Sequence, residues 1–509
     1  MEKSIIIIGA GIAGLSAGCY GQMNGYRTRI FEQHNQPGGL CTAWKRKGYT
    51  FDGCISWLVG SAPGTGVYPI WEELGAVQNR QFVNHDEFFR IEGEGGKTLI
   101  VYTSIDRFAK HLKELAPNDT AIIDELAQAV RVMSKFGSPV GKAGELYNWF
   151  DYLKLIPKMA PFGGIFKKYG SMTVRKFAEG FSDPFLRKAF GSFFSIPDFP
   201  MIAFLSTLGW MHRQAAGYPI GGSLEFSRAI EGRYLDLGGE IHYQSRVVKI
   251  LTEENRAVGV RLADGSEHRA DRVVSAADGH ATIYEMLEGK YIDAEIERRY
   301  REMPIFQPLI QVSLGVNRDL GKEPHQITYQ LKQPISIAGK LREEIGVRHY
   351  CYDPTMAPAG KSVLVVMFDS NYQYWKELGA DRGKYRAEKE SIAELTVRGL
   401  EQRFPGLAGQ IEVIDVATPL TFERYTGNWQ GSFEGWLITI QTFNLKIKKT
   451  LPGLDDFYMI GQWVQPGGGL PPEAQAGRDL IQVLCKKDRK WFGSNKPKAV
   501  PALGAKPAV

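Results

Sequence analysis

A glycine motif directly after a run of isoleucines constrains this chain more than any other feature. The residues from Lys3 to Ile8 predict a buried strand, and Gly9, Gly11 and Gly14 follow it in the spacing G-x-G-x-x-G. From Ile12 to Asn24, small and apolar side chains recur at helical spacing. Gly9 would permit a tight turn, Gly11 would let the backbone approach a pyrophosphate, and Gly14 would let helix and strand pack closely. The pattern predicts a dinucleotide-binding strand–turn–helix unit.

The second predicted strand, Arg27 to Phe31, ends at an acidic residue. Glu32 lies 18 positions beyond Gly14, where a carboxylate can accept hydrogen bonds from a ribose diol. A carboxylate at this place disfavours a 2′-phosphate, which leaves NAD or FAD as the dinucleotide. The strand–helix–strand order implies a parallel sheet. The backbone N–H groups at the start of the helix, including those of Ile12 and Ala13, are placed to meet the phosphates.

Composition and charge exclude several other classes of protein. The chain has 509 residues, 43% of them hydrophobic and 23% charged, so it can bury a large core. A net charge of +6 does not require a nucleic-acid partner, and the nine histidines show no metal-ligand spacing. Five cysteines without a CxxC pair indicate reduced thiols. No apolar run approaches the roughly 18 residues of a spanning helix, so we expect a cytoplasmic protein that is at most peripheral to a membrane.

A second glycine pair favours FAD over NAD. Pro37, Gly38 and Gly39 follow Glu32, and the stretch FEQHNQPGGLCTAWKRKGYTFDG ends at Phe51-Asp52-Gly53. This stretch resembles a flavoprotein family that includes phytoene desaturases, carotenoid isomerases, retinol saturases and, more distantly, amine oxidases. The family has a glycine two residues after the aspartate, where Cys54 stands here. The resemblance implies FAD contacts at Gln33, Gly38, Gly39 and Leu40.

The resemblance continues in three later segments. These are the PIGG element at 219–222, the segment at 238–278 that begins GGEIHYQSRVV, and the segment MIGQWVQPGGGLPPEAQAGRDL at 459–480. The second implies that the backbone of Val247 or Val248 meets the adenine, and that Ser275 and Ala276 lie beside the pyrophosphate. The third implies that Gly461 contacts the phosphate or ribitol. In the third segment, relatives commonly carry glycine and serine where Pro472 and Ala476 stand. A helix is expected to begin within this segment and to face the flavin. The resemblance implies cofactor contacts at its start, from Gly469, Leu470 and Pro471.

We therefore predict an α/β protein with a discontinuous Rossmann-type FAD-binding domain, built on a doubly wound parallel sheet, and an interleaved α+β substrate domain. The FAD-binding domain would comprise residues 1–75, 219–300 and 450–490. The substrate-binding domain would comprise residues 76–218 and 301–449. Residues 493–509 are rich in Pro, Ala, Lys and Gly, and we expect them to form a disordered tail.

The region from 144 to 215 is unusually aromatic. Its side chains suit a long apolar tunnel for a polyene, isoprenoid or acyl chain, and the alternative is an ordinary aromatic core. Four lysines, at 154, 158, 167 and 168, are interleaved with apolar residues, which suits either an interfacial segment that extracts lipid or the solvated face of a lid. The candidate substrate-binding residues are Trp149, Phe162, Phe194, Trp210, His212 and Tyr425.

Glu473 is the sharpest candidate for a catalytic acid or base, because it follows the flavin-facing glycines and burial there would raise its pKa. The alternative is a first-turn acid that favours the helix dipole. The resemblance implies an FAD-dependent oxidoreductase that acts on a carbon–carbon bond of a lipophilic, polyene-type substrate, with oxygen or a quinone as electron acceptor. The alternatives are redox-neutral cis–trans isomerisation by reduced FAD, saturation of the retinol saturase type, amine oxidation, and flavin binding without turnover.

Overall fold

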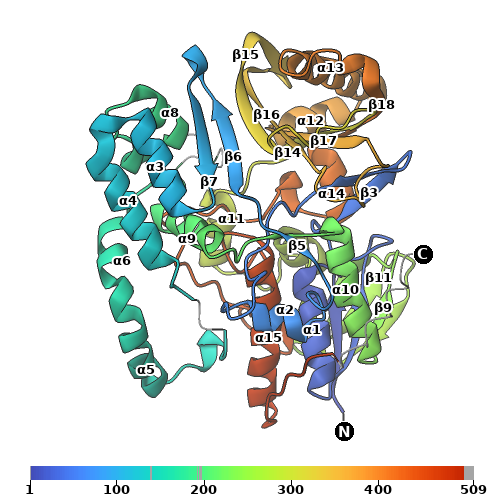
Figure 1. Cartoon of the computed structure of the whole chain (residues 1–509). Helices are drawn as coiled ribbons and strands as arrows, with labels where there is room; N and C mark the ends of the chain where they lie inside the picture. Colours follow the sequence, from blue (N-terminus) through green and yellow to red (C-terminus); the bar gives the residue numbers. More distant parts are fainter. Residues whose placement is uncertain (1, 138–139, 192, 194–195, 197, 498–509) are drawn as a thin grey trace, which may run out of the picture.

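A five-stranded parallel sheet lies at the centre of the lower half of the molecule (Figure 1). The computed structural model describes residues 2–137, 140–191, 193, 196 and 198–497. The strand order is β19-β13-β1-β2-β9, and every neighbouring pair is parallel. The strands are drawn from distant parts of the chain: β1 (Ser4–Ile8), β2 (Arg27–Phe31), β9 (Glu240–His242), β13 (Arg272–Ser275) and β19 (Phe457–Met459).

The two faces of this sheet are covered differently. Ile5 and Ile7 of β1 point to a core shared with the helices α1 (Ile12–Met23), α10 (Gly222–Asp236) and α15 (Leu470–Lys487). Ile6 and Ile8 point to the opposite face, because successive side chains of a strand alternate. That face packs against an antiparallel sheet formed by β10 (Val247–Glu253), β11 (Arg256–Leu262) and β12 (Glu267–Arg269). The predicted fold class is confirmed, with strands in place of helices on this second face.

A seven-stranded mixed sheet lies above the parallel sheet. Its order is β18-β14-β17-β16-β15-β6-β7, with only the β15–β6 pair parallel. Leu364 and Val366 face the helices α12 (Tyr372–Gly379) and α13 (Arg382–Glu401), whereas Val363 and Val365 join the core of the nucleotide-binding half. The strands are β6 (Glu87–Glu92), β7 (Thr98–Tyr102), β14 (Leu309–Val316), β15 (Gln326–Ile337), β16 (Lys340–His349), β17 (Ser362–Asp369) and β18 (Ile411–Ala417).

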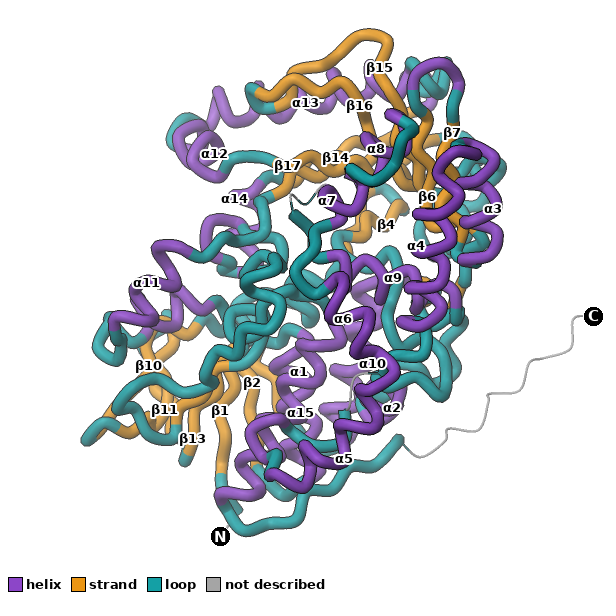
Figure 2. Tube along the Cα trace, turned by 90° about the vertical axis from the view of Figure 1, so that its left-hand side faces the viewer, coloured by secondary structure: helices purple, strands orange, loops and turns teal. Residues whose placement is uncertain are grey.

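The aromatic region forms a helical lobe with its own core (Figures 1 and 2). Its described helices pack around a core that contains several buried phenylalanines. Among the described residues, no helix has the length and apolar character needed to cross a bilayer. The helices are α3 (Ile105–Leu115), α4 (Thr120–Met133), α5 (Trp149–Met159), α6 (Gly163–Tyr169), α7 (Val174–Ala178), α8 (Pro184–Gly191) and α9 (Met201–His212).

Short elements connect these parts. The hairpin of β3 (Ala43–Arg46) and β4 (Tyr49–Asp52) joins the two halves, since the amide of Gln311 in β14 donates to the Asp52 carbonyl at 3.0 Å. The remaining named segments are α2 (Tyr68–Glu73), β5 (Phe82–Val83), β8 (Tyr218–Pro219), α11 (Ala294–Glu302) and α14 (Pro419–Thr426).

The first residues of the predicted disordered tail are held against the fold. Gly493 donates its N–H to the Asn24 side chain at 2.7 Å, and the Ser494 hydroxyl donates to Glu73 at 2.7 Å. Lys496 forms a 2.8 Å ion pair with Glu72. These partners belong to α2 and to the end of α1, so the chain remains anchored to residue 496. Residues 498–509 lie outside the described part of the chain.

Candidate active site

The carboxyl ends of four parallel strands meet at one edge of the sheet, and most of the predicted cofactor residues gather there. Ile8 of β1 is paired with both Phe31 and Ser275. Ala276 donates its N–H to the Ile8 carbonyl at 2.9 Å, and Ile460 donates to the Ser275 carbonyl at 2.9 Å. Residues that are far apart in sequence thus become neighbours, in the crevice where open α/β sheets bind their ligands.

The first glycine motif has the geometry of a phosphate cradle. Gly9 has a φ of +98°, and a Cβ on Gly14 would lie 2.0 Å from the Gly9 carbonyl oxygen, so glycine is required at both positions. A Cβ on Gly11 would meet nothing within 4 Å. Gly11 is the N-cap of α1 and carries no side-chain cap, which leaves the first N–H groups of Ile12 and Ala13 available to an anion.

A second helix begins beside the first. Gly469 is the N-cap of α15, has a φ of +87°, and a Cβ on it would meet nothing within 4 Å. A Cβ on Gly461 would lie 3.7 Å from that of Ala13 and 3.0 Å from Oε2 of Glu473. The starts of α1 and α15 therefore border the same open region, with Leu470 and Pro471 forming the first turn of α15. Two helix N-termini beside open space suit the diphosphate and the flavin of FAD.

The predicted second glycine pair lies across from the first motif. Gly38 donates its N–H to the Ala10 carbonyl at 2.9 Å and forms a bridge with Gly11. A Cβ on Gly39 would lie 3.5 Å from the Gly11 Cα, so a larger residue there would narrow the cradle. Leu40 completes the turn, with its carbonyl accepting the Thr42 N–H at 2.9 Å.

Glu32 and its neighbours form the other end of the crevice. Ser245 donates its N–H to the Glu32 carbonyl at 2.8 Å, which brings the start of β10 to this end. Val247 is buried there, while Val248 is exposed. The Gln33 amide donates to the Tyr425 carbonyl at 3.2 Å. The residues expected around the ribose and adenine thus lie together.

Two buried carboxyl groups flank the glycine-rich loop before α15. Burial and, to a lesser extent, the charge of Glu434 raise the pKa of Glu473 to about 8, although a hydrogen bond from the Gln462 N–H opposes the rise. Burial raises the pKa of Glu434 to about 7. Oε1 of Glu473 is buried and has no hydrogen-bond partner among the described residues. A Cβ on Gly468 would lie 3.0 Å from Oε2 of Glu434, so the loop passes directly over that side chain. Both groups can hold a proton near neutral pH.

Glu434 was missed by sequence reasoning. The only signal for it is an acidic residue between aromatic and glycine residues in the segment GSFEGW, which is ambiguous by itself. Asp52 was quoted only as part of a motif. Its buried carboxylate accepts hydrogen bonds from the N–H and hydroxyl of Ser223, at 2.7 and 2.6 Å, and from the Cys54 N–H at 2.9 Å. Burial raises the pKa of Asp52, and these donors oppose the rise.

Three of the predicted substrate residues lie in the helical lobe. Phe162 is 8% exposed and packs edge-on against Phe136 in the core of the helical lobe. Trp210 packs against the same core, and the His212 ring accepts the Ile105 N–H at 3.4 Å, which fixes the start of α3. Trp210 and His212 lie on α9, which packs against α3 and α4, whereas Phe162 lies in the turn before α6. Phe194 lies outside the described residues.

The other two predicted substrate residues lie at the surface. Trp149 is 62% exposed at the start of α5. Tyr425 is 46% exposed and packs edge-on against His34, because α14 ends beside the strand end that carries Glu32. Trp149 and Tyr425 therefore lie on different parts of the surface, on α5 and α14.

A small pocket lies where the helical lobe, the mixed sheet and the nucleotide-binding half meet. Its volume is about 20 Å³, which is the size of a water molecule. The rings of His85 and His325 stack in its wall with centroids 3.8 Å apart. The sequence analysis selected none of the residues that line this pocket. The lining residues are Ser56, Trp57, Asn84, His85, Glu87, Phe88, Thr103, Met211, Gln214, Ala216, His325 and Gln326.

Comparison with known proteins agrees with this geometry. The chain is 26% identical to a chloroplastic prolycopene isomerase of Daucus carota, over 95% of this chain and 79% of the relative. It is 23% identical to a neurosporene-forming phytoene desaturase of Rhodobacter capsulatus, over 94% of this chain and 93% of the relative. An oxidoreductase structure from Methanosarcina mazei has the same fold, with a TM-score of 0.60 and 17% identity over 94% of this chain and all of that one.

The family model for flavin containing amine oxidoreductases matches residues 12–424. This match confirms the family resemblance and the FAD cofactor that the glycine motifs predict. The residues at the carboxyl edge of the sheet fit that cofactor, since both helix N-termini face open space. The chain belongs to the flavin containing amine oxidoreductase family and is an FAD-dependent oxidoreductase.

Proposed function

We propose that the protein acts on a carbon–carbon bond of a lipophilic polyene or isoprenoid. The observation that carries this proposal is the extent of similarity to enzymes of that chemistry. The prolycopene isomerase and the phytoene desaturase each match at least 94% of this chain, so the similarity includes the helical lobe and the mixed sheet. Bound FAD would supply the two-electron chemistry.

The chain's own residues have three tasks in this proposal. The N–H groups at the starts of α1 and α15 bind the anionic parts of the cofactor. Apolar side chains of the mixed sheet, such as Val363 and Val365, pack against the nucleotide-binding half and help to exclude water from it. Glu473 and Glu434 hold protons beside the glycine-rich loop, where a group that donates or accepts a proton near pH 7 is most effective.

A second candidate, cis–trans isomerisation by reduced flavin, is supported by these same two carboxyl groups. Because their pKa values are raised, these carboxyl groups can donate a proton to the substrate and take it back, without net oxidation of the substrate. Product analysis separates the candidates. Oxidised and photoreduced holoenzyme are incubated anaerobically with a cis-polyene and with a less conjugated isoprenoid. A product lighter by two hydrogens means desaturation, a heavier one means saturation, and an isomer of equal mass means isomerisation. Turnover of amines alone would overturn the proposal.

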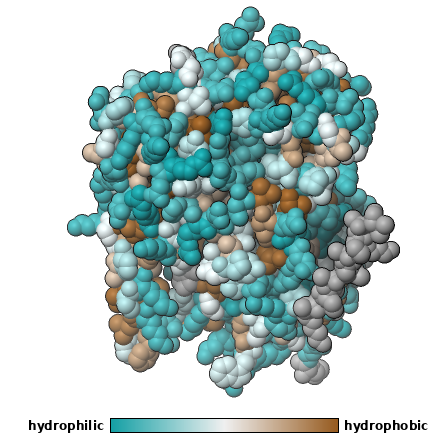
Figure 3. All heavy atoms as spheres, viewed as in Figure 1, coloured by the Kyte–Doolittle hydropathy of each residue, from teal (hydrophilic) through white to brown (hydrophobic). Residues whose placement is uncertain are grey.

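The partner from which such a substrate comes would be a membrane surface, and α5 is the segment that supports this. None of the eleven residues of α5 is buried. Apolar side chains gather over this helix at the lower left of Figure 3, in the orientation of Figure 1. Lys154, Lys158 and Lys167 are exposed beside them, as in helices that lie on anionic membranes. The exposed apolar residues are Trp149, Phe150, Tyr152, Leu153 and Ile156.

Vesicle flotation tests this membrane contact. We expect the protein to float with vesicles that contain an anionic phospholipid and to float less with phosphatidylcholine alone. The double variant Trp149→Ser and Ile156→Ser should lose binding. Trp491→Ser is the matched control, because Trp491 is 97% exposed but lies beyond α15. Equal flotation of wild type and the α5 variant would contradict the assignment.

A further inference from the structure

A groove of about 1340 Å³ lies between α13 and β18, the strand at one edge of the mixed sheet. Pockets for small molecules typically have volumes of about 300–1,000 Å³, so this groove has room for a larger partner. Apolar side chains of both elements line it, such as Val397 of α13 and Ile414 of β18. Ile414 is 41% exposed, so apolar surface is left open to solvent here.

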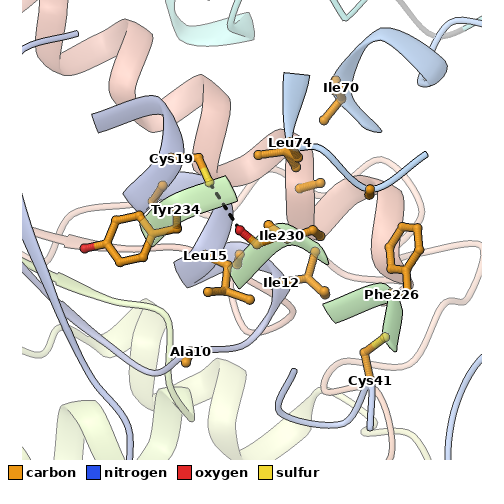
Figure 4. Close-up of a cluster of buried hydrophobic side chains, with 14 of the residues drawn as sticks. Ala10, Ile12, Leu15, Cys19, Cys41, Ile70, Leu74, Phe226, Ile230 and Tyr234 are labelled. Atoms are coloured by element: carbon orange, nitrogen blue, oxygen red, sulfur yellow. Dashed lines mark hydrogen bonds between the residues drawn. The ribbon is translucent and has the colours of Figure 1, made fainter. Parts of the chain in front are cut away.

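The groove lies away from the cofactor site. α13 covers the face of the mixed sheet that carries Leu364 and Val366, which is turned away from the nucleotide-binding half. In that half, α1 and α10 pack together in a separate core, through side chains such as Leu15 and Ile230 (Figure 4). Figure 1 shows α13 and β18 at the upper end of the molecule and the parallel sheet in its lower half. A partner can therefore occupy the groove without contact with the cofactor.

Most of the charged residues that α13 contributes to the groove form no ion pair within the described part of the chain. Arg386 and Glu390 are the exception, since they pair with each other at 2.8 Å. Arg382 begins the helix and Glu401 ends it, which is the reverse of the order that the helix dipole favours. The dipole therefore does not account for these charges. The groove residues without an ion pair are Arg382, Lys389, Glu394, Arg398 and Glu401.

The charges of α13 are complementary to those of a second α13 that runs in the opposite direction. When the midpoints of two antiparallel copies of the helix coincide, Arg382 of each copy lies opposite Glu401 of the other. In the same register, Lys389 of each copy lies opposite Glu394 of the other. All four residues line the groove. The unpaired charges at the two ends and at the middle of the helix thus neutralise one another.

The remaining groove residues of α13 fit the same register. Arg386 lies opposite Val397, and Glu390 lies opposite Ala393. The intrahelical pair of Arg386 and Glu390 therefore faces uncharged side chains and can persist. No two like charges among the groove residues of α13 lie opposite each other.

We propose that the groove is a dimer interface, in which α13 of a second copy of this chain packs antiparallel against α13 of the first. A two-fold axis through the midpoint of the helix makes the contact isologous, so each pair of opposite charges occurs twice. Arg398 of one copy faces Tyr385 of the other, where a guanidinium can lie over the ring. The exposed surface of Ile414 and Val397 is removed from water. This inference rests neither on the proposed function nor on the cofactor.

Charge reversal at Lys389 and Glu394 tests the interface. FAD-loaded wild type should sediment as a dimer, at twice the 56.9 kDa of one chain. Lys389→Glu or Glu394→Lys alone places two pairs of like charges in the interface, so the dissociation constant of the dimer should rise by about 100-fold or more. An equimolar mixture of the two variants should form a dimer again, because each reversed residue then meets the opposite charge. The double variant Lys389→Glu and Glu394→Lys should dimerise by itself for the same reason.

Lys384→Glu is the matched control. It makes the same charge change on the same helix, but Lys384 does not line the groove, so the dimer should persist. Flavin absorbance and circular dichroism show whether each variant is folded, and the double variant replaces the mixture if a single variant is not. Wild type that remains a monomer at every protein concentration would overturn the proposal. So would a dimer that persists in both single variants, or a mixture and a double variant that both stay monomeric. None of these measurements uses a substrate, so failure of the proposed function would leave them unaffected.

Discussion

Oε2 of Glu32 accepts a hydrogen bond from the Ala10 N–H at 2.7 Å, so the residue that ends β2 holds the glycine loop that follows β1. Its Oε1 accepts the His34 N–H at 2.8 Å. Burial raises the pKa of Glu32, and the backbone donors oppose the rise. The acid that the motif assigns to the ribose is therefore also a structural brace for the phosphate cradle.

The glycines of the first motif should respond differently to substitution. Gly11→Val should fold, because a side chain there enters open space, but it should be purified without FAD because that space is the cradle. Flavin absorbance per protein and a urea melt measure the two effects. A yellow, fully loaded Gly11→Val protein would contradict the site.

Gly14→Ala is the matched contrast. Its added methyl group would lie 2.0 Å from the Gly9 carbonyl oxygen, so α1 must shift away from β1. We expect the free energy of unfolding to fall by ~3 kcal/mol or more, as for overpacked cores. A stability equal to wild type would mean that α1 can move without cost.

The ion pair of Arg272 and Asp488 ties β13 to the end of α15. Both guanidinium nitrogens of Arg272 donate to the carboxylate at 2.6 Å, and Arg272 is 2% exposed. Removing the carboxylate should cost up to about 3–5 kcal/mol, because it leaves the buried guanidinium with only the longer ion pair between its Nε and Asp456, at 3.6 Å. Asp488→Asn should therefore unfold at a clearly lower urea concentration at pH 7.

The pH dependence of this effect has a definite sign. Burial disfavours ionisation of Asp488, but hydrogen bonds from Arg272, Lys3 and Tyr26 outweigh it and hold its pKa well below the usual range. The stabilisation is present above the unfolded pKa of about 3.9 and is lost as the pH falls below it. The difference between wild type and Asp488→Asn should shrink below about pH 4. A difference that is constant with pH would contradict the role of the charge.

The contribution of Glu473 to stability should depend on pH in the opposite direction. Its pKa is raised to about 8, so the folded flavin-free protein favours the protonated form. Stability is then lost as the pH rises from the unfolded value of about 4.3 towards the folded value. Between pH 5 and pH 9, the melting temperature of wild type should fall further than that of Glu473→Gln. Parallel melting curves would mean that Glu473 is ionised as an ordinary first-turn acid.

Glu473 also has a kinetic test. If its proton is used in turnover, Glu473→Ala should slow the enzyme more than it weakens FAD binding. Glu473→Gln should keep FAD while flattening the pH profile between about pH 7 and 9. Unchanged rates in both variants would assign Glu473 to the helix dipole.

The parallel sheet and its glycine loops could be predicted because their signals are local. Gly9 is required by its positive φ and Gly14 by the close approach of the Gly9 carbonyl, and both causes lie within one strand–turn–helix unit. The role of the aromatic lobe could not be predicted in this way. An aromatic residue such as Phe162 or Trp210 looks the same in the sequence whether it packs in a core or lines a tunnel. Only the three-dimensional packing of the lobe distinguishes a core from a tunnel.

The polar groups that sequence reasoning missed depend on long-range contacts. Glu434 is buried because the loop that contains Gly468 passes over it. The sequence of neither segment alone indicates that they approach each other. The contact between Tyr425 and His34 also depends on a long-range approach, since it joins the end of α14 to the segment after β2.

An anaerobic flavin spectrum, recorded before and after addition of purified polyenes and isoprenoids, tests the central claim most directly. For a desaturase, the absorbance of oxidised flavin should bleach with a lipophilic donor and not with amines. For an isomerase, photoreduced enzyme should convert the polyene while the flavin stays reduced. Bleaching by amines, with no response to any polyene in either redox state, would contradict the account.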